Sequence, residues 1–172
     1  MNTEVGPVRV GDVLPPLEIE ITRTLIVAGA IASRDYQDVH HDAELARQKG
    51  SPDIFMNILT TNGLVGRYIT DRFGPRSVLR RVAIRLGAPN YPGDTMVLTG
   101  TVEAVDGDTA TVRVVGANGI GRHVTGTVTV TVPGAAGAVG ADGARVAQGA
   151  EGAEGIEGAE DAAVHEAAGS RP

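Results

Sequence analysis

Residues 77–133 alternate between apolar and polar side chains with a period of two, and this alternation constrains the fold more than any other feature. Such a period places one set of side chains on each face of a β-strand. Interruptions at 89–94, 106–108 and 118–119 contain the Pro, Gly, Asn and Asp residues of tight turns. In the last segment, four valines at 124, 128, 130 and 132 alternate with threonines at 125, 127, 129 and 131. The pattern predicts four consecutive antiparallel strands.

The first half of the chain follows helical spacing instead, apart from one further short strand. The expected elements are a strand at 17–22, a helix at 24–33 with Thr24 at its N-cap, and a short helix at 43–50 that Asp42 caps and Gly50 ends. These elements all precede the predicted four-stranded region.

A longer helix is expected within residues 54–73, beginning between residues 52 and 57 with Asp53 as its cap. Its apolar stripe is broad enough for a mostly buried helix and consists of Phe55, Ile58, Leu59, Val65, Tyr68 and Ile69. Gly63 and Gly66 each cost about 1 kcal/mol relative to Ala inside a helix, so we expect close packing against both. One long helix and one antiparallel sheet predict an α+β domain in which the sheet wraps around the helix.

The sequence changes character at Gly134. Residues 134–172 hold 9 of the 24 glycines, 13 alanines, 7 acidic and 2 basic residues, and no aromatic residue. They therefore carry −5 of the formal net charge of −6, which leaves −1 for residues 1–133. Glycine recurs at every third position, but a collagen helix would also need abundant proline. We predict a domain at 1–133 followed by a disordered acidic tail at 134–172, with a docking role for the tail as the alternative.

The composition also excludes several classes of function. With 0 cysteines, the chain can form neither a disulfide framework nor a thiolate metal site. The negative net charge argues against nucleic-acid binding, and no apolar run approaches the roughly 20 residues of a membrane span. The N-terminus lacks the layout of a signal peptide, so we expect a cytoplasmic protein. No P-loop, dinucleotide-binding fingerprint or G-x-S-x-G nucleophile elbow is present.

Ionisable residues concentrate in the segment 33–42, between two expected helices. Asp35 and His40 lie five residues apart across a loop, a spacing that lets both side chains turn toward one point. A carboxylate and an imidazole there could hold a water molecule, accept one of its protons and deliver a proton to a substrate. Purely structural roles for both residues are the alternative. A metal site is the least favoured interpretation and would use Asp35, Asp38, His40, His41 and Asp42.

The start of the long helix offers a second chemical feature, because its first backbone N–H groups have no helical acceptor. Such a group can stabilise a carbonyl oxygen that gains negative charge in a transition state, and routine capping is the structural alternative. The other two histidines, His123 in the last strand and His165 in the tail, are expected to face solvent.

Residues 33–63 read SRDYQDVHHDAELARQKGSPDIFMNILTTNG. This segment resembles the signature of MaoC-like (R)-specific enoyl-CoA hydratases, a family with the hot-dog fold. Asp35 and His40 match the catalytic Asp and His of that family, and Asn57 matches the glycine whose backbone N–H holds the thioester oxygen. The segment departs from the usual pattern where Arg34 replaces a glycine and where Met56 and Asn57 replace His–Gly.

The segment is most similar to one branch of the family, the small MaoC-like subunit of actinobacterial hydratases that act on steroid (cholesterol) side-chain enoyl-CoA thioesters. The resemblance implies addition of water to a trans-2-enoyl-CoA to give a 3-hydroxyacyl-CoA. Asp35 and His40 would be catalytic, and the Asn57 N–H would hold the enolate oxygen. The resemblance implies no metal and no cofactor, because coenzyme A is part of the substrate. It implies a second MaoC-domain subunit in a heterodimer or heterotetramer, or otherwise a homodimer.

Arg81 and Arg85 are weaker candidates for binding the CoA phosphates, and a solvated strand face is the favoured interpretation. Three other functions stay open. A non-catalytic hot-dog partner would only shape another subunit's site, and an acyl-CoA-binding module would leave the acyl group unchanged. Acyl-CoA thioesterases of this fold generally carry a carboxylate on the central helix, whereas residues 55–70 contain no Asp or Glu.

Overall fold

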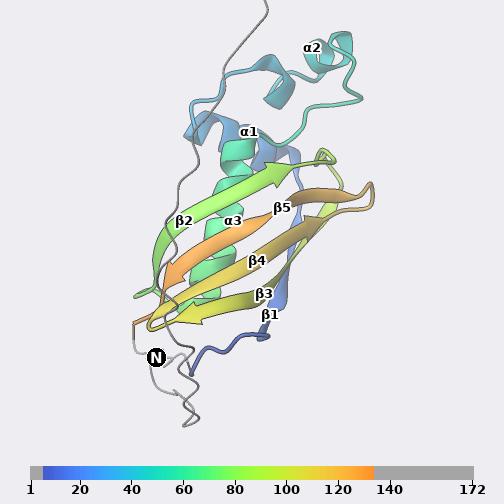
Figure 1. Ribbon diagram of the computed structural model, residues 1–172. Helices are drawn as coiled ribbons and strands as arrows, with labels where there is room; N and C mark the ends of the chain where they lie inside the picture. The colour runs from blue at the N-terminus through green and yellow to red at the C-terminus, as the bar shows by residue number, and fades with distance from the viewer. Residues whose placement is uncertain (1–5, 134–172) are drawn as a thin grey trace, which may run out of the picture. The chain divides into compact units, whose positions relative to one another are not determined.

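A five-stranded antiparallel sheet curves around helix α3 (Ile58–Phe73) in the computed structural model, which describes residues 6–133 (Figure 1). The strands are β1 (Val13–Glu20), β2 (Val78–Leu86), β3 (Thr95–Asp106), β4 (Thr109–Ala117) and β5 (Arg122–Thr131). Their order across the sheet is β1-β3-β4-β5-β2, so β1 and β2 form its two edges. The predicted α+β class, with a sheet wrapped around a long helix, is confirmed.

The four strands predicted from the period-two pattern all form. β3 and β4 are joined at the predicted Gly107 turn, and β4 and β5 at the predicted Asn118 turn. β2 pairs with β5 and forms one edge of the sheet, so that Val82 lies opposite Val128. The valines at 124, 128 and 130 expose 1% or less of their surface, while the threonines between them are less buried. The alternation in β5 therefore separates a core face from an outer face as predicted.

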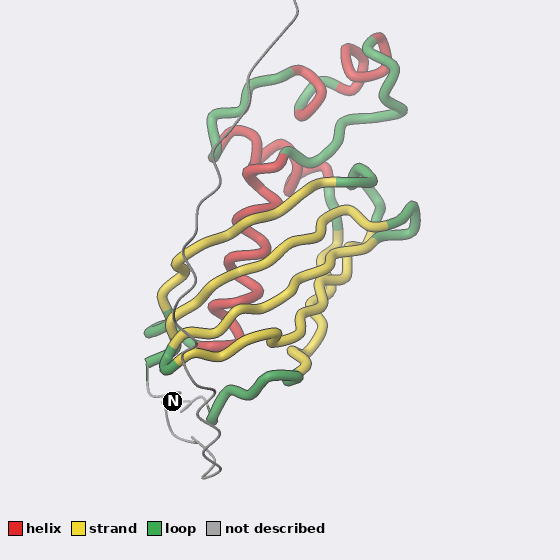
Figure 2. Tube along the Cα trace, viewed as in Figure 1, coloured by secondary structure: helices red, strands yellow, loops and turns green. Residues whose placement is uncertain are grey.

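The remaining helices gather at one end of the sheet, beside the N-terminus of α3 (Figure 2). They are α1 (Arg23–Ala32), the 3-10 turn η1 (Asp38–His40) and α2 (Ala43–Gln48). Thr22 caps α1 in place of Thr24, because its hydroxyl accepts a hydrogen bond from the Leu25 N–H at 3.0 Å. Asp42 caps α2 as predicted.

The core lies between the sheet and α3. Val65 and Ile69 of α3 are fully buried in one cluster with Leu98, Val112 and Val128 of the sheet. Burial of each such side chain contributes about 1.5–3 kcal/mol to folding. This packing fixes α3 against the sheet and thereby fixes the position of its N-terminus.

β1 begins at Val13 and ends at Glu20, so the prediction of a strand at 17–22 was wrong in its bounds. The strand contains Pro15 and Pro16, which cannot donate a backbone hydrogen bond and so argue against a strand from sequence alone. The structure accommodates them because β1 is an edge strand whose register with β3 shifts between residues 14 and 17.

α3 begins at Ile58 with Asn57 as its N-cap, so the expected cap at Asp53 was wrong. The backbone explains the difference. The N–H of Phe55 donates to the Val39 carbonyl at 3.0 Å, and the N–H of Met56 donates to the Asn90 carbonyl at 3.1 Å. These bonds tie residues 55 and 56 to neighbouring segments, and the helix begins only after Asn57.

The predicted burial of α3 was partly wrong. Its stripe is buried at Val65, Tyr68 and Ile69. Ile58 and Leu59, however, are 45% and 47% exposed, because the first turn of α3 turns these side chains away from the core. A Cβ on Gly66 would lie 3.3 Å from Leu79, as close packing predicts, whereas a Cβ on Gly63 would have no neighbour within 4 Å.

His123 is 1% exposed, so the expectation that it faces solvent was wrong. It is the extra residue of a β-bulge, because Arg122 pairs with Ala117 and Val124 with Gly116. The bulge turns His123 inward, and burial lowers the pKa of its imidazole. His165 and the predicted tail lie outside the described residues. In residues 6–133, no helix is both long enough and apolar enough to cross a membrane.

Candidate active site

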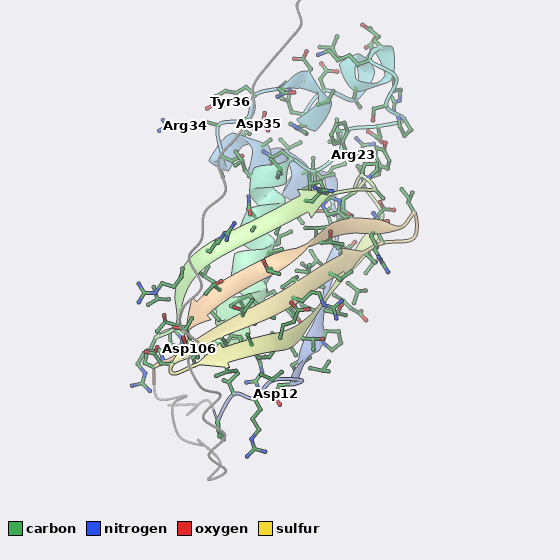
Figure 3. The ribbon with its side chains drawn as sticks, viewed as in Figure 1. Asp12, Arg23, Arg34, Asp35, Tyr36 and Asp106 are labelled. Carbon is green, nitrogen blue, oxygen red and sulfur yellow. The ribbon has the colours of Figure 1, made fainter. Side chains whose placement is uncertain are left out.

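The structure brings Asp35 and His40 together at the end of the sheet where α1, α2 and the N-terminus of α3 meet. Figure 3 shows Asp35 at this end, far from Asp12 and Asp106. The Nε2 atom of His40 lies 3.4 Å from Oδ2 of Asp35. Both side chains are largely withdrawn from solvent, with exposed fractions of 7% for His40 and 18% for Asp35.

A hydrogen bond to the backbone fixes the proton on His40. Its Nδ1 lies 2.7 Å from the carbonyl oxygen of Phe55. A carbonyl can only accept, so Nδ1 carries the hydrogen and Nε2 of the neutral ring carries a lone pair. The Phe55 ring contacts the imidazole edge-on, with 5.1 Å between ring centroids. The imidazole is therefore held so that its unprotonated nitrogen faces Asp35.

This arrangement places two hydrogen-bond acceptors, the Asp35 carboxylate and His40 Nε2, beside each other. Two acceptors at 3.4 Å cannot bond to each other directly without a proton between them. A water molecule that donates one hydrogen to each satisfies both. The pair is suited to hold such a water and to accept a proton from it.

The chain reaches Asp35 through an unusual backbone turn. Arg34 has a φ of 57°, and among residues 6–133 it is the one non-glycine residue in the left-handed region. The N–H of Asp35 then donates to the Ala30 carbonyl at 2.9 Å, which ties the loop to the end of α1. Glycine adopts such a φ readily, and glycine is the residue that Arg34 replaces in the signature that the segment resembles.

Asn57 connects the loop to the start of α3. Its side-chain amide donates to Oδ2 of Asp35 at 3.0 Å and to the hydroxyl of Ser33 at 2.8 Å. Its Oδ1 accepts the Thr60 N–H at 2.9 Å and so caps the helix. Within residues 6–133, no acceptor takes the backbone N–H of Asn57 itself. That N–H lies at the positive end of the α3 dipole, where a developing negative charge is stabilised.

The other ionisable groups of the segment are engaged elsewhere. A hydrogen bond from Lys49 at 2.7 Å, together with its charge, lowers the pKa of Asp38. Asp42 accepts the first N–H groups of α2, and Nε2 of His41 lies 3.1 Å from the Tyr36 carbonyl. The part of the chain that the structure describes contains no cluster of three or more metal-ligating side chains.

An ion pair holds the segment that leads into α3. The two terminal guanidinium nitrogens of Arg23, at the start of α1, donate to the two carboxylate oxygens of Asp53. This hydrogen bonding lowers the pKa of Asp53. Asp53 is thus a bracing residue between α1 and the segment before α3, and not the helix cap.

Arg81 and Arg85 lie apart from this centre. They are exposed on the outer face of β2, opposite Thr129 and Thr125. The inward residues of the same strand, such as Ile84, pack against the core. A role for the two arginines in binding CoA phosphates stays a prediction.

An open groove borders the site. It lies between α1 and α3, has a volume of about 340 Å³, and is lined by Gly29, Ala32, Ser33, Leu59, Thr60, Gly63 and Leu64. Most of this lining is small or apolar, and Ser33 links it to Asn57 and hence to Asp35. The groove offers an apolar group a place to lie within reach of the pair.

Sequence reasoning missed three contributors to the site: the Ser33 hydroxyl, the Asn57 side chain and the Phe55 carbonyl. All three belong to the segment whose motif was recognised, so their neighbourhood was predicted. Their contacts were not, because each joins residues 15 to 24 positions apart in the chain.

Fold and site together define the class of protein: a hot-dog domain with a carboxylate–imidazole pair at the N-terminus of its central helix. A model of the MaoC-like domain family matches residues 5–131, and the chain belongs to that family. The resemblance seen in the sequence is therefore confirmed.

Known relatives agree with this assignment. The chain is 50% identical over 123 residues to the 3-oxo-4,17-pregnadiene-20-carboxyl-CoA hydratase beta subunit of Mycobacterium tuberculosis, covering 72% of this chain and 95% of that protein. It is 49% identical to a chain in the crystal structure of the ChsH1–ChsH2 complex from the same organism, with a TM-score of 0.71 over 72% of this chain and 98% of that one. An (R)-hydratase from A. caviae, at 21% identity, has the same fold with a TM-score of 0.68 over 73% and 98% of the two chains.

Proposed function

We propose that this chain is the catalytic subunit of an enoyl-CoA hydratase, which adds water to a trans-2-enoyl-CoA thioester to give a 3-hydroxyacyl-CoA. The observation that carries the proposal is the convergence of Asp35 and His40 as two hydrogen-bond acceptors 3.4 Å apart. The Asn57 N–H, which no acceptor within residues 6–133 takes, supports it, because hydration passes through a negatively charged enolate oxygen.

The proposed reaction uses each of these groups once. Water donates its hydrogens to Asp35 and His40, and its oxygen attacks the β-carbon of the enoyl group. The carbon–carbon double-bond electrons move toward the thioester, whose oxygen accepts the Asn57 N–H. The Asp35–His40 pair takes one proton from the attacking water and returns one proton to the α-carbon. The product has gained one hydroxyl and one hydrogen, so the pair ends as it began.

We propose that no metal or organic cofactor takes part. Water addition to an enoyl thioester is acid–base chemistry, and the thioester itself provides the electron-withdrawing group. Coenzyme A enters and leaves as part of the substrate.

We further propose a steroid acyl chain as the substrate and a second MaoC-domain subunit as the partner. The M. tuberculosis relative is named for a pregnadiene-carboxyl-CoA substrate and as a beta subunit, and the similar crystal structure is of a two-protein complex. The open groove beside the site, with Leu59 47% exposed, suits a large apolar group or a covering subunit.

The test is a hydration assay on the chain co-purified with a second MaoC-domain subunit, following the loss of the enoyl absorbance. Asp35→Asn and His40→Ala should each lower kcat by about 100-fold or more, because each removes one partner of the acid–base pair. Asp38→Asn and His41→Ala are matched controls from the same segment and should retain activity.

Retained hydration in Asp35→Asn and His40→Ala would show that this chain is a non-catalytic partner. Release of free CoA in a thiol assay, without hydration, would identify a thioesterase instead. Saturable binding of crotonyl-CoA without loss of the enoyl absorbance would identify a binding module.

A further inference from the structure

We propose that the Asn57 side chain is a positioning residue, which holds the Asp35 carboxylate in the orientation that the acid–base pair requires. This inference rests on the proposed function, which uses only the backbone N–H of Asn57. It gives the Asn57 side chain a role of its own. Asn57 is 2% exposed, so its amide is not free to exchange these contacts for water.

The orientation of the Asn57 amide follows from its three partners. Asp35 accepts only, so the group 3.0 Å from its Oδ2 must be the NH₂. The backbone N–H of Thr60 donates only, so the group 2.9 Å from it must be the oxygen. A flipped amide would set oxygen against carboxylate and NH₂ against N–H. The amide is therefore fixed in one orientation.

Ser33 fixes the second amide hydrogen. The Ser33 hydroxyl lies 2.7 Å from the Gly29 carbonyl, at the end of α1, and donates its one hydrogen there. Its oxygen is then left as an acceptor for the Asn57 amide at 2.8 Å. Asn57 thus joins the end of α1, the start of α3 and Asp35 in one network.

The network determines which oxygen of Asp35 is available. Oδ2 faces both the Asn57 amide, at 3.0 Å, and Nε2 of His40, at 3.4 Å. With Oδ2 held at this point, rotation of the carboxylate is restricted, and Oδ1 is left to accept a hydrogen bond from water or substrate. Without the amide, the backbone N–H of Asp35 still donates to the Ala30 carbonyl, but among residues 6–133 no side chain other than a protonated His40 would donate to the carboxylate.

The test measures kcat and KM of the two-subunit complex carrying Asn57→Ser. Serine still caps a helix but is too short to reach Asp35, so the change removes the bridge and keeps the cap. We expect kcat to fall about 10- to 100-fold, as for a misplacement of about 1 Å, while KM changes less than about twofold. Thr22→Ala, which removes the distant cap of α1, should lower the melting temperature and leave kcat unchanged.

Asn57→Gly provides the second variant, because glycine at an N-cap costs only a few tenths of a kcal/mol and leaves the backbone N–H in place. It should lower kcat to the same extent as Asn57→Ser. If both variants fold and keep kcat within about twofold of the wild type, the positioning role is wrong.

A double variant separates this inference from the proposed function. If Asn57 acts through Asp35, adding Asn57→Ser to Asp35→Asn should lower kcat no further. An additional fall by the same factor would overturn the positioning role. Full activity in Asp35→Asn alone would instead overturn the proposed function.

Discussion

At the scale of single residues, two buried histidines differ in the hydrogen-bond partner of one ring nitrogen. This difference distinguishes the candidate catalytic histidine from the structural one. His40 and His123 both donate from Nδ1 to a backbone carbonyl, at 2.7 Å in each case. Both therefore have an accepting Nε2. For His123 the partner is the Thr61 hydroxyl at 2.9 Å, which can donate and so satisfies the ring. For His40 the partner is Asp35, which cannot donate when ionised, so the ring still needs a proton source.

The structural histidine should make stability depend on pH. Burial lowers the pKa of His123 below its ordinary value of 6.5, so the folded protein keeps it neutral while the unfolded chain ionises. The unfolded state then binds more protons below pH 6.5, and the free energy of unfolding should fall there by up to about 1.4 kcal/mol per pH unit. Above pH 6.5 this contribution is fully present.

Urea unfolding at pH 7.5, 6.5 and 5.5 measures this dependence. His123→Gln keeps a polar side chain that cannot take up a proton. Its free energy of unfolding should be lower than that of the wild type at pH 7.5 and should change less between pH 7.5 and 5.5. Equal slopes for the two proteins would show that His123 does not cause the dependence.

Sequence spacing was sufficient to predict the pair Asp35 and His40, since a five-residue loop can bring both side chains to one point. It could not predict the Asn57 bridge, because Asn57 lies 22 residues from Asp35 and 24 from Ser33. It misplaced His123 because strand alternation assumes a regular register, and a bulge lies at that residue.

At the scale of elements, local pattern and tertiary hydrogen bonding determine different features. The strands β2 to β5 were predictable because period-two alternation and turn residues are local signals. The start of α3 was not, because the Phe55 and Met56 N–H groups are bonded to residues 39 and 90. The same tertiary contacts place the α3 N-terminus, and with it Asn57, next to the loop that carries Asp35.

Two glycines of the groove should respond in opposite ways to the same substitution. A Cβ on Gly29 of α1 would lie 2.9 Å from Cγ2 of Thr60 and closer still to its hydroxyl. Gly29→Ala should therefore lower stability, with overpacking of about 1–3 kcal/mol exceeding the gain in helix propensity of about 1 kcal/mol. Gly63→Ala meets no atom within 4 Å and should raise stability by up to about 1 kcal/mol.

Chemical denaturation of both variants tests this contrast. Adding Thr60→Ala to Gly29→Ala should recover part of the lost stability, because it removes the overlapping hydroxyl and methyl groups. Stabilisation by Gly29→Ala would show that α1 and α3 do not pack as closely as described.

At the scale of the whole molecule, the site forms where three segments meet at one end of the sheet. The end of α1, the loop at 33–42 and the start of α3 each supply part of it, and the sheet supplies the surface against which α3 is fixed (Figure 1). The groove beside the site is open in the single chain. This arrangement accounts for a domain in which Asp35 and His40 lie beside an open apolar groove, as the proposed function requires.

The last prediction concerns residues 134–172. The family match ends at residue 131, and the 50%-identical M. tuberculosis relative is covered over 95% of its length by 72% of this chain. A shortened chain of residues 1–133 should therefore keep its melting temperature within about 2 °C, because the core lies within residues 6–133. With the proposed partner subunit it should also keep the proposed hydratase activity, because Asp35 and His40 lie within the same residues. Loss of the acidic segment changes the formal net charge from −6 to −1, so earlier elution from an anion exchanger confirms the deletion. A large fall in melting temperature would show that residues beyond 133 contribute to stability. A fall in activity at unchanged melting temperature would instead give that segment a role in the assembled complex, since the fold that holds Asp35 and His40 would still be intact.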